Sequence, residues 1–294
     1  MGRRITGDFI MMEVELASRE AVQYIVRRFN IRMKHKLGQN FLIRPEVVKK
    51  IADAAELAPG MPVMEIGPGI GTLTQGLART GAEVTAFEID ETLRDVLSHT
   101  LEPYPNVHII FEDVLKANLP EILAGREWHA AANLPYYITT PVLLYLVQSE
   151  LPISLFVFMM QKEVADRILA EPGTRDYGML TIGVGYYCTA ERVMNIEPAA
   201  FVPRPGVTST VVKLRRREKP AVAVKNEKKF FALVKMGFGQ RRKVFTNAMK
   251  NGGIDAELIP KILETADIDG TRRGETFSME EYARLADAWE AISN

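Results

Sequence analysis

Hydrophobic positions in the first two thirds of the chain follow two alternating patterns. Short apolar runs that end at glycine, acidic or amide residues are typical of buried parallel strands. Longer segments with apolar residues three and four positions apart predict helices. The expected strands are 63–66, 84–89, 107–111, 128–132 and 153–160, and the expected helices are 18–31, 45–56, 72–79, 91–101, 139–148 and 162–170. This alternation predicts an α/β fold, a Rossmann-like parallel sheet with helices on both faces.

The pattern changes after residue 179. Residues 180–187, 192–196 and 208–214 predict further strands, which we expect to be antiparallel at the end of the sheet. The charged stretch that begins at Arg215 indicates an exposed linker, and four helices are expected beyond it, at 228–237, 241–250, 256–266 and 278–291. Ser278 and Glu281 have the spacing of a capping box. We therefore expect an N-terminal extension and helix (1–35), a Rossmann-like domain (36–215) and a small helical domain (216–294).

Composition excludes several classes of protein. The 294 residues contain no run of 18 apolar residues, and the start lacks the long apolar stretch of a secretory signal, so we expect no membrane segment. The single cysteine, Cys188, excludes an internal disulfide and a cysteine metal cluster. Four scattered histidines show no metal-ligand spacing, so no metal is expected. A reducing cytoplasm is the simplest compartment.

Charge is balanced overall but unevenly distributed. The chain has 37 Lys and Arg against 37 Asp and Glu, yet residues 213–250 contain thirteen basic residues against two acidic ones, and 251–294 contain four against ten. A second basic cluster, at 32–44, contains no acidic residue. Two basic zones on a neutral protein fit a polyanion-binding surface, although a plain solvated surface is the alternative reading of each alone.

Three glycines and two acidic residues indicate a nucleoside-like cofactor. Gly67, Gly69 and Gly71 lie between a strand and a helix, where glycine lets the backbone turn sharply and approach a ligand. Their spacing is not that of the dinucleotide fingerprint. Glu88, at the end of the second strand, suits the two ribose hydroxyls. Asp113, just after the third strand, suits an adenine amino group. NAD remains an alternative, without an evident hydride-transfer constellation.

The tetrapeptide Asn133-Leu134-Pro135-Tyr136 suits a planar amino group that accepts a methyl group. The Asn133 side-chain oxygen accepts one amino proton, and the backbone carbonyl of Leu134 accepts the other. Pro135 stiffens the loop, and Tyr136 offers a stacking face for a base. In-line transfer would then depend on proximity and orientation. Together the two segments predict an S-adenosylmethionine-dependent N-methyltransferase.

At these residues the chain resembles the KsgA-type family of ribosomal RNA small-subunit adenine dimethyltransferases. The matching segments, in family order, are 37–42 (LGQNFL), 65–74 (EIGPGIGTLT), 87–90 (FEID), 112–115 (EDVL), 133–136 (NLPY), 158–163 (FMMQKE), 201–209 (FVPRP through Ser209) and 238–243 (FGQRRK). The resemblance covers roughly residues 19–290.

The resemblance implies a class I S-adenosylmethionine-dependent methyltransferase. It implies dimethylation of N6 of two adjacent adenosines near the 3′ end of 16S rRNA, on an assembling small (30S) ribosomal subunit. Asn40 and Leu42 match positions that close over the cofactor, and Gly67, Glu88, Asp113 and Asn133 match its other contacts. A 23S rRNA methyltransferase of the macrolide-resistance type is the close alternative. A ribosome-assembly factor whose methylation matters little belongs to a different class.

The basic zone of the helical domain then has an expected role. We expect Arg241, Arg242 and Lys243 to contact rRNA phosphates, which position a protein on RNA without reading its sequence. A monomer is the default expectation.

Overall fold

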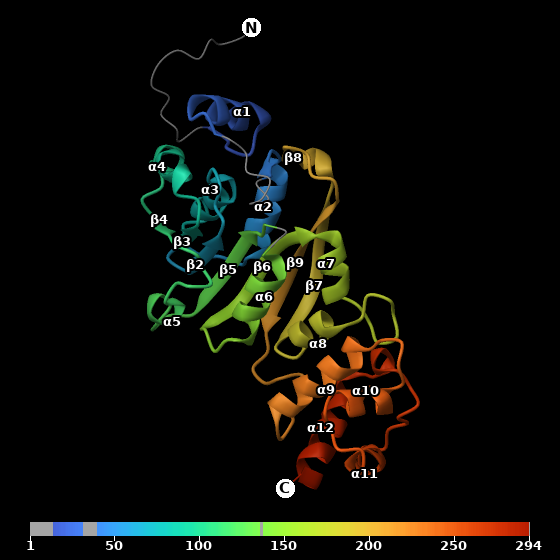
Figure 1. Ribbon diagram of the computed structural model, residues 1–294. Helices are drawn as coiled ribbons and strands as arrows, with labels where there is room; N and C mark the ends of the chain where they lie inside the picture. The colour runs from blue at the N-terminus through green and yellow to red at the C-terminus, as the bar shows by residue number, and fades with distance from the viewer. Residues whose placement is uncertain (1–13, 32–39, 136–137, 294) are drawn as a thin grey trace. The chain divides into compact units, whose positions relative to one another are not determined.

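A seven-stranded sheet organises the computed structural model, which describes residues 14–31, 40–135 and 138–293. Figure 1 shows its strand order, β4-β3-β2-β5-β6-β9-β7. Strands β1 and β8 pair in a separate two-stranded sheet. The strands are β1 (Phe41–Leu42), β2 (Pro62–Ile66), β3 (Glu83–Glu88), β4 (Val107–Phe111), β5 (Trp128–Asn133), β6 (Ile153–Gln161), β7 (Cys188–Ile196), β8 (Phe201–Val202) and β9 (Ser209–Arg216).

Strands β4, β3, β2, β5 and β6 are parallel. Their registers place Ile66 beside Phe87 and beside Ala132, and Asn133 beside Met159, so the carboxyl ends of these strands lie at one edge. All five residues of β2 are buried, which explains its continuous apolar run. The predicted parallel sheet is confirmed.

The last two strands run antiparallel to their neighbours, as predicted. The amide of Lys162, after β6, donates to the carbonyl of Thr208, just before β9. The hydroxyl of Thr210, near the start of β9, donates to Asn195, near the end of β7. Such pairing of one strand's start with the other's end occurs only between antiparallel strands.

The helices are α1 (Arg19–Arg28), α2 (Pro45–Ala54), α3 (Thr72–Ala78), α4 (Arg94–Leu101), α5 (Leu119–Ile122), α6 (Thr139–Gln148), α7 (Lys162–Ile168), α8 (Met179–Gly185), α9 (Glu227–Gly239), α10 (Phe245–Asn251), α11 (Leu258–Ala266) and α12 (Met279–Ser293), with 3-10 turns η3 (Glu91–Leu93), η4 (Pro198–Ala200) and η5 (Gly274–Thr276). The Ser18 hydroxyl caps α1 by accepting from the Ala21 amide. The predicted capping box of α12 is present: the Ser278 amide donates to Glu281, and the Glu281 amide donates to Ser278. None of the described helices is long and apolar enough to cross a membrane.

Two secondary-structure predictions were wrong. Residues 180–187 were expected to form a strand but lie mostly in α8, whose Leu180, Ile182 and Val184 are buried. Their β-branched residues favour strands only weakly, and tertiary packing overrides that preference. The helix expected from Arg241 begins only at Phe245, so residues 241–243 lie in the turn between α9 and α10.

The chain forms two compact units. Of the described residues, unit 1 contains 14–31, 40–135, 138–142, 151–162 and 193–213, and unit 2 contains 143–150, 163–192 and 214–293. In unit 1, α2 and α3 pack against the sheet through Val48, Ile51 and Leu77. Unit 2 has its own apolar core, formed mainly by α8 to α12. The predicted division at residues 35 and 215 stays a prediction.

Candidate functional site

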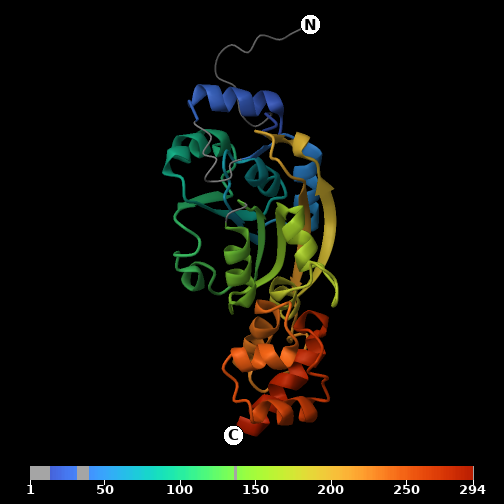
Figure 2. The same cartoon turned by 45° about the vertical axis from the view of Figure 1, so that its right-hand side comes forward.

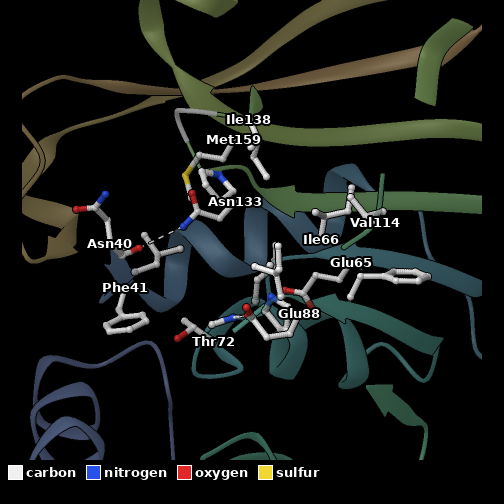
Figure 3. A pocket seen from close by; sticks show the side chains of 18 of the residues that line it. Asn40, Phe41, Glu65, Ile66, Thr72, Glu88, Val114, Asn133, Ile138 and Met159 are labelled. Carbon is white, nitrogen blue, oxygen red and sulfur yellow. Dashed lines mark hydrogen bonds between the residues drawn. The ribbon is translucent and has the colours of Figure 1, made fainter. Parts of the chain in front are cut away.

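A pocket in unit 1 lies at the carboxyl edge of β2, β3, β4 and β5 (Figure 3). It is lined by residues of the glycine loop, the strand ends and the segment before β1: Asn40, Phe41, Leu42, Ile51, Glu65, Ile66, Gly67, Pro68, Gly69, Thr72, Leu73, Phe87, Glu88, Ile89, Glu112, Asp113, Val114, Leu115, Asn133, Pro135, Ile138 and Met159. In open α/β sheets this edge is where ligands bind. The lining brings together segments separated by more than 90 positions along the chain.

The glycine loop requires its glycines for two different reasons. Gly67, Gly69 and Gly71 have φ angles of +69°, +60° and +89°, in the left-handed region that other residues rarely adopt. Space is a second restriction at Gly71, where a Cβ would lie 3.0 Å from a methyl carbon of Leu101. Gly71 also precedes α3, so the loop delivers the chain directly into that helix.

Two buried carboxyl groups lie beneath this loop. Glu88 is 5 % exposed; it accepts from the Gly69 amide at 3.2 Å and from the Asp90 amide at 2.8 Å. Burial raises its pKa. Glu65 is 1 % exposed, and burial, with the charge of Glu88 adding to it, raises the pKa of Glu65 to about 8. Among the described residues, Oε2 of Glu65 has no hydrogen-bond partner. A desolvated, partly unsatisfied carboxyl pair of this kind favours a cationic or hydroxyl-bearing ligand.

Asp113 and the segment before β1 complete the wall around these carboxyl groups. Asp113 is half-buried directly after β4, and its Oδ1 accepts from the Leu115 amide at 3.0 Å, which fixes the turn. Leu42 is buried and Asn40 is half-buried; both line the pocket. The cofactor residues expected from the sequence therefore lie around one pocket, although their roles stay predictions.

The Asn133 side chain is held in one orientation at the end of β5. Its Nδ2 donates to the Asn40 carbonyl at 3.3 Å, which directs Oδ1 away from Asn40 (Figure 3). Leu134 is 1 % exposed and donates its amide to the Met159 carbonyl. The Pro135 carbonyl accepts from the Thr139 hydroxyl at 3.0 Å, which anchors the loop to α6. Tyr136 lies outside the described residues.

The expected RNA-binding residues occupy a turn of unit 2. Arg242 and Lys243 are exposed. Arg241 is also exposed, but its guanidinium donates to Glu275 at 2.8 Å and to the backbone carbonyls of Arg175 and Tyr177 at 2.9 and 3.0 Å. Arg241 therefore fixes the local structure, whereas its two neighbours project their charge into solvent.

Comparison with known proteins decides the family. The Ribosomal RNA adenine dimethylase family profile matches residues 30–285. The chain belongs to this family. Family members include the Ribosomal RNA small subunit methyltransferase A of Anoxybacillus flavithermus, 47% identical over 94% of this chain and 97% of its own. The protein of the same name from Geobacillus sp. is 43% identical over 96% of this chain and 100% of its own.

Solved structures of related methyltransferases support the membership of this chain in the adenine dimethylase family. A dimethyladenosine transferase from Plasmodium falciparum superposes with a TM-score of 0.72 at 26% identity, covering 83% of this chain and 95% of that one. The 23S rRNA methyltransferase ErmE superposes with a TM-score of 0.66 at 27% identity, covering 85% of this chain and 100% of its own. The methyltransferase fold expected from the sequence is thus confirmed.

Sequence reasoning missed Glu65, Ile138 and Met159 in the pocket of this family member. A signal was present for Glu65, because a carboxylate two residues before Gly67 must lie at the end of the same strand. Met159 gave no signal, since its neighbours in β6 are equally apolar and fully buried.

Proposed function

We propose that this protein transfers methyl groups from S-adenosylmethionine to N6 of two adjacent adenosines near the 3′ end of 16S rRNA. The products are N6,N6-dimethyladenosines, formed within the small (30S) ribosomal subunit during its assembly. One observation carries the proposal: a single pocket brings the oriented Asn133 amide beside Glu65, Glu88 and Asp113. Identities of 43–47% to relatives named as small-subunit methyltransferases support the choice of subunit.

The pocket fits the proposed cofactor. S-adenosylmethionine carries a sulfonium, an ammonium, two ribose hydroxyls and an adenine, and the buried Glu65 and Glu88 offer carboxyl oxygens to cations and hydroxyls. We assign Glu88 to the ribose hydroxyls, Asp113 to the adenine amino group, and the backbone of Gly67 and Gly69 to close packing. Asn40 and Leu42 cover the ligand.

The chemistry requires orientation more than a strong base. When bound, S-adenosylmethionine supplies an electrophilic methyl group on its sulfonium. Asn133 Oδ1 and the Leu134 carbonyl accept the two amino protons of the target adenine, which aims the nitrogen lone pair at that methyl group. One proton leaves the nitrogen for each methyl group gained. Pro135 holds the loop rigid, and Tyr136 stacks on the base.

Binding of rRNA depends on charge displayed elsewhere on the chain. We assign Arg242 and Lys243 to phosphate contacts. Arg241 anchors the turn that carries them, through its hydrogen bonds to the carbonyls of Arg175 and Tyr177. The proposed protein acts as a monomer in the cytoplasm and uses no metal.

Methyl transfer to three substrates tests the proposal. Labelled S-adenosylmethionine is incubated with unmethylated small subunits, with large subunits and with naked 16S rRNA, and the modified nucleosides are then identified. Dimethyladenosine on small-subunit particles is the expected result. Label in large-subunit RNA would assign the protein to the 23S group, which the likeness to ErmE keeps as the second candidate.

A third reading, an assembly factor that scarcely methylates, predicts tight binding of small subunits with little transfer. Glu88→Ala separates the two roles of the protein, because it removes a pocket carboxylate without changing the exposed basic turn. Loss of transfer with retained subunit binding is expected.

A further inference from the structure

Helix α1 presents an exposed face that the proposed catalytic chemistry does not use. The residues pointing outward are Arg19, Glu20, Gln23, Tyr24, Arg27 and Arg28. Tyr24 is 47% exposed, which is unusual for a large aromatic side chain, and Arg27 and Arg28 follow it three and four positions later on the same side. Within the described residues, the side chains of Arg19, Tyr24 and Arg27 make no hydrogen bond or ion pair. The face thus combines an open ring with unpaired guanidinium groups.

The helix is firmly attached, so this face has a fixed position. Gln75 of α3, 1 % exposed, accepts from the Leu16 amide at 2.9 Å and donates to the Val14 carbonyl at 2.9 Å and to the Tyr104 hydroxyl at 3.0 Å. Arg79 of α3 pairs with Glu15 at 2.7 Å. These bonds hold the chain just before α1 against the helix that follows the glycine loop. A helix that served only as a solvated surface would not require these hydrogen bonds to hold it in one position.

The inner side of α1 packs next to the pocket. Val22 and Ile25 belong to one apolar cluster with Phe41 and Ile70, and Phe41 lies against Gly69 of the glycine loop. Figure 3 shows the dark-blue ribbon of α1 beyond Phe41, and Figure 2 shows the helix at the same end of unit 1 as α4. Eight residues separate Ile31 from Asn40, whose carbonyl holds Asn133. At no more than about 3.5 Å per position, Ile31, which lies three residues beyond the end of α1, is at most about 32 Å from Asn40.

We propose that this face of α1 binds the rRNA strand next to the target adenosines, with Tyr24 stacked on an unpaired base and Arg27 and Arg28 on phosphates. Exposed aromatic rings among arginines are the means by which proteins hold single-stranded nucleic acid without reading its sequence. Target adenosines must leave any stack to reach the pocket, so the flanking strand needs a separate support. The inference rests on the proposed function, since it takes rRNA as the substrate.

Equilibrium binding to unmethylated small subunits tests the inference. Tyr24→Ala should weaken binding about 5- to 100-fold, because a stacked base is lost, while Tyr24→Phe should stay within about 2-fold of the original protein. Arg27→Glu should weaken binding about 10-fold at low salt and lower the slope of log affinity against log salt by about 1. Lys50→Glu, an exposed reversal on α2 of the same unit, is the matched control and should change affinity by no more than about 2-fold.

Three companion measurements separate the possible failures. S-adenosylmethionine affinity by calorimetry and the melting temperature should be unchanged in every variant, which shows that folding and the pocket are intact. Methyl transfer by the original protein decides the proposed function, whereas the ratio of variant to original affinities decides the role of α1. Equal affinities of Tyr24→Ala, Arg27→Glu and Lys50→Glu would overturn the inference. So would a dimer of the original protein that Tyr24→Ala dissociates, since the face would then bind a second copy.

Discussion

The pocket of unit 1 and the basic turn at 240–243 of unit 2 differ in solvent exposure: the carboxyl groups of the pocket are buried, whereas the basic side chains of the turn are exposed. In the pocket, Glu65 and Glu88 are 1 % and 5 % exposed, and the pKa of each is raised by burial. In the turn, Arg242 and Lys243 are exposed. Removal of water strengthens each polar interaction in the pocket, whereas water and salt weaken each one at the turn.

This difference predicts where a single substitution should have a large effect and where it should have a small one. A small ligand is held by a few desolvated groups, so single substitutions in the pocket should have large effects that are insensitive to salt. A polyanion is held by many exposed charges, so single substitutions in the turn should have modest, salt-dependent effects. The following predictions test the contrast in order of decreasing effect.

Removal of the Asn133 amide should have the largest effect. Asn133→Ala should lower the rate of methyl transfer about 10²- to 10³-fold, because the Oδ1 acceptor for the target amino group is lost. Subunit affinity, measured by equilibrium binding, should change by less than about 2-fold. Asn118→Ala, at an exposed site on the same unit, is the control and should transfer at the original rate. A parallel loss of subunit binding in Asn133→Ala would show that the pocket and the docking surface are not separate.

A substitution in the glycine loop should have a nearly equal effect, measured as a change in the free energy of unfolding. Gly71→Ala introduces a Cβ at φ +89° and at 3.0 Å from Leu101, so backbone strain and overpacking together should lower the free energy of unfolding by about 2–4 kcal/mol. Gly125→Ala is the matched control, since its φ is +79° but nothing lies within 4 Å of the new Cβ. Strain alone should cost it about 1 kcal/mol. Urea unfolding measures both, and equal losses would show that packing against Leu101 is not restrictive.

Glu65 should link stability to pH. Its pKa is about 8 when folded and near 4.5 when unfolded, so its favourable contribution is complete below about pH 4.5 and is lost as pH rises towards 8. Between pH 5 and pH 8 the original protein should therefore lose about 3.5 kcal/mol more unfolding free energy than Glu65→Gln. Glu46→Gln, an exposed change in α2, should follow the original protein. Identical pH profiles for all three would mean that Glu65 is not strongly desolvated.

The same contrast explains how much of the fold and of the site could be predicted from the sequence. The five parallel strands, the glycine loop and the order of Glu88, Asp113 and Asn133 were predictable, because buried strands and strand-end residues leave a regular pattern. Residues 180–187 were not predictable. Their β-branched residues favour a strand, but Ile182 and Tyr186 pack into the core of unit 2 from a helix.

Side-chain partners could not be predicted from the sequence. Arg241, Arg242 and Lys243 look equivalent as sequence, and only the carbonyls of Arg175 and Tyr177, more than 60 residues away, distinguish Arg241. Likewise, nothing in the sequence of residues 14–28 indicated that Gln75 anchors the chain before α1. Long-range hydrogen bonds of this kind depend on the tertiary fold, which local patterns do not specify.

Substitutions in the basic turn should have the smallest and most salt-dependent effects. Arg241 should behave differently from Arg242 and Lys243. Arg242→Glu and Lys243→Glu should each weaken small-subunit binding about 10-fold at low salt, with the salt slope lowered by about 1 and with the melting temperature unchanged. Arg241→Ala should instead lower the free energy of unfolding by about 1–3 kcal/mol, because the carbonyls of Arg175 and Tyr177 lose a charged donor. Arg241→Lys restores the charge but not the forked geometry, so it should recover only part of the lost stability. If all of these variants change affinity alike and stability not at all, the three residues act as one electrostatic patch, and the structural distinction of Arg241 is wrong.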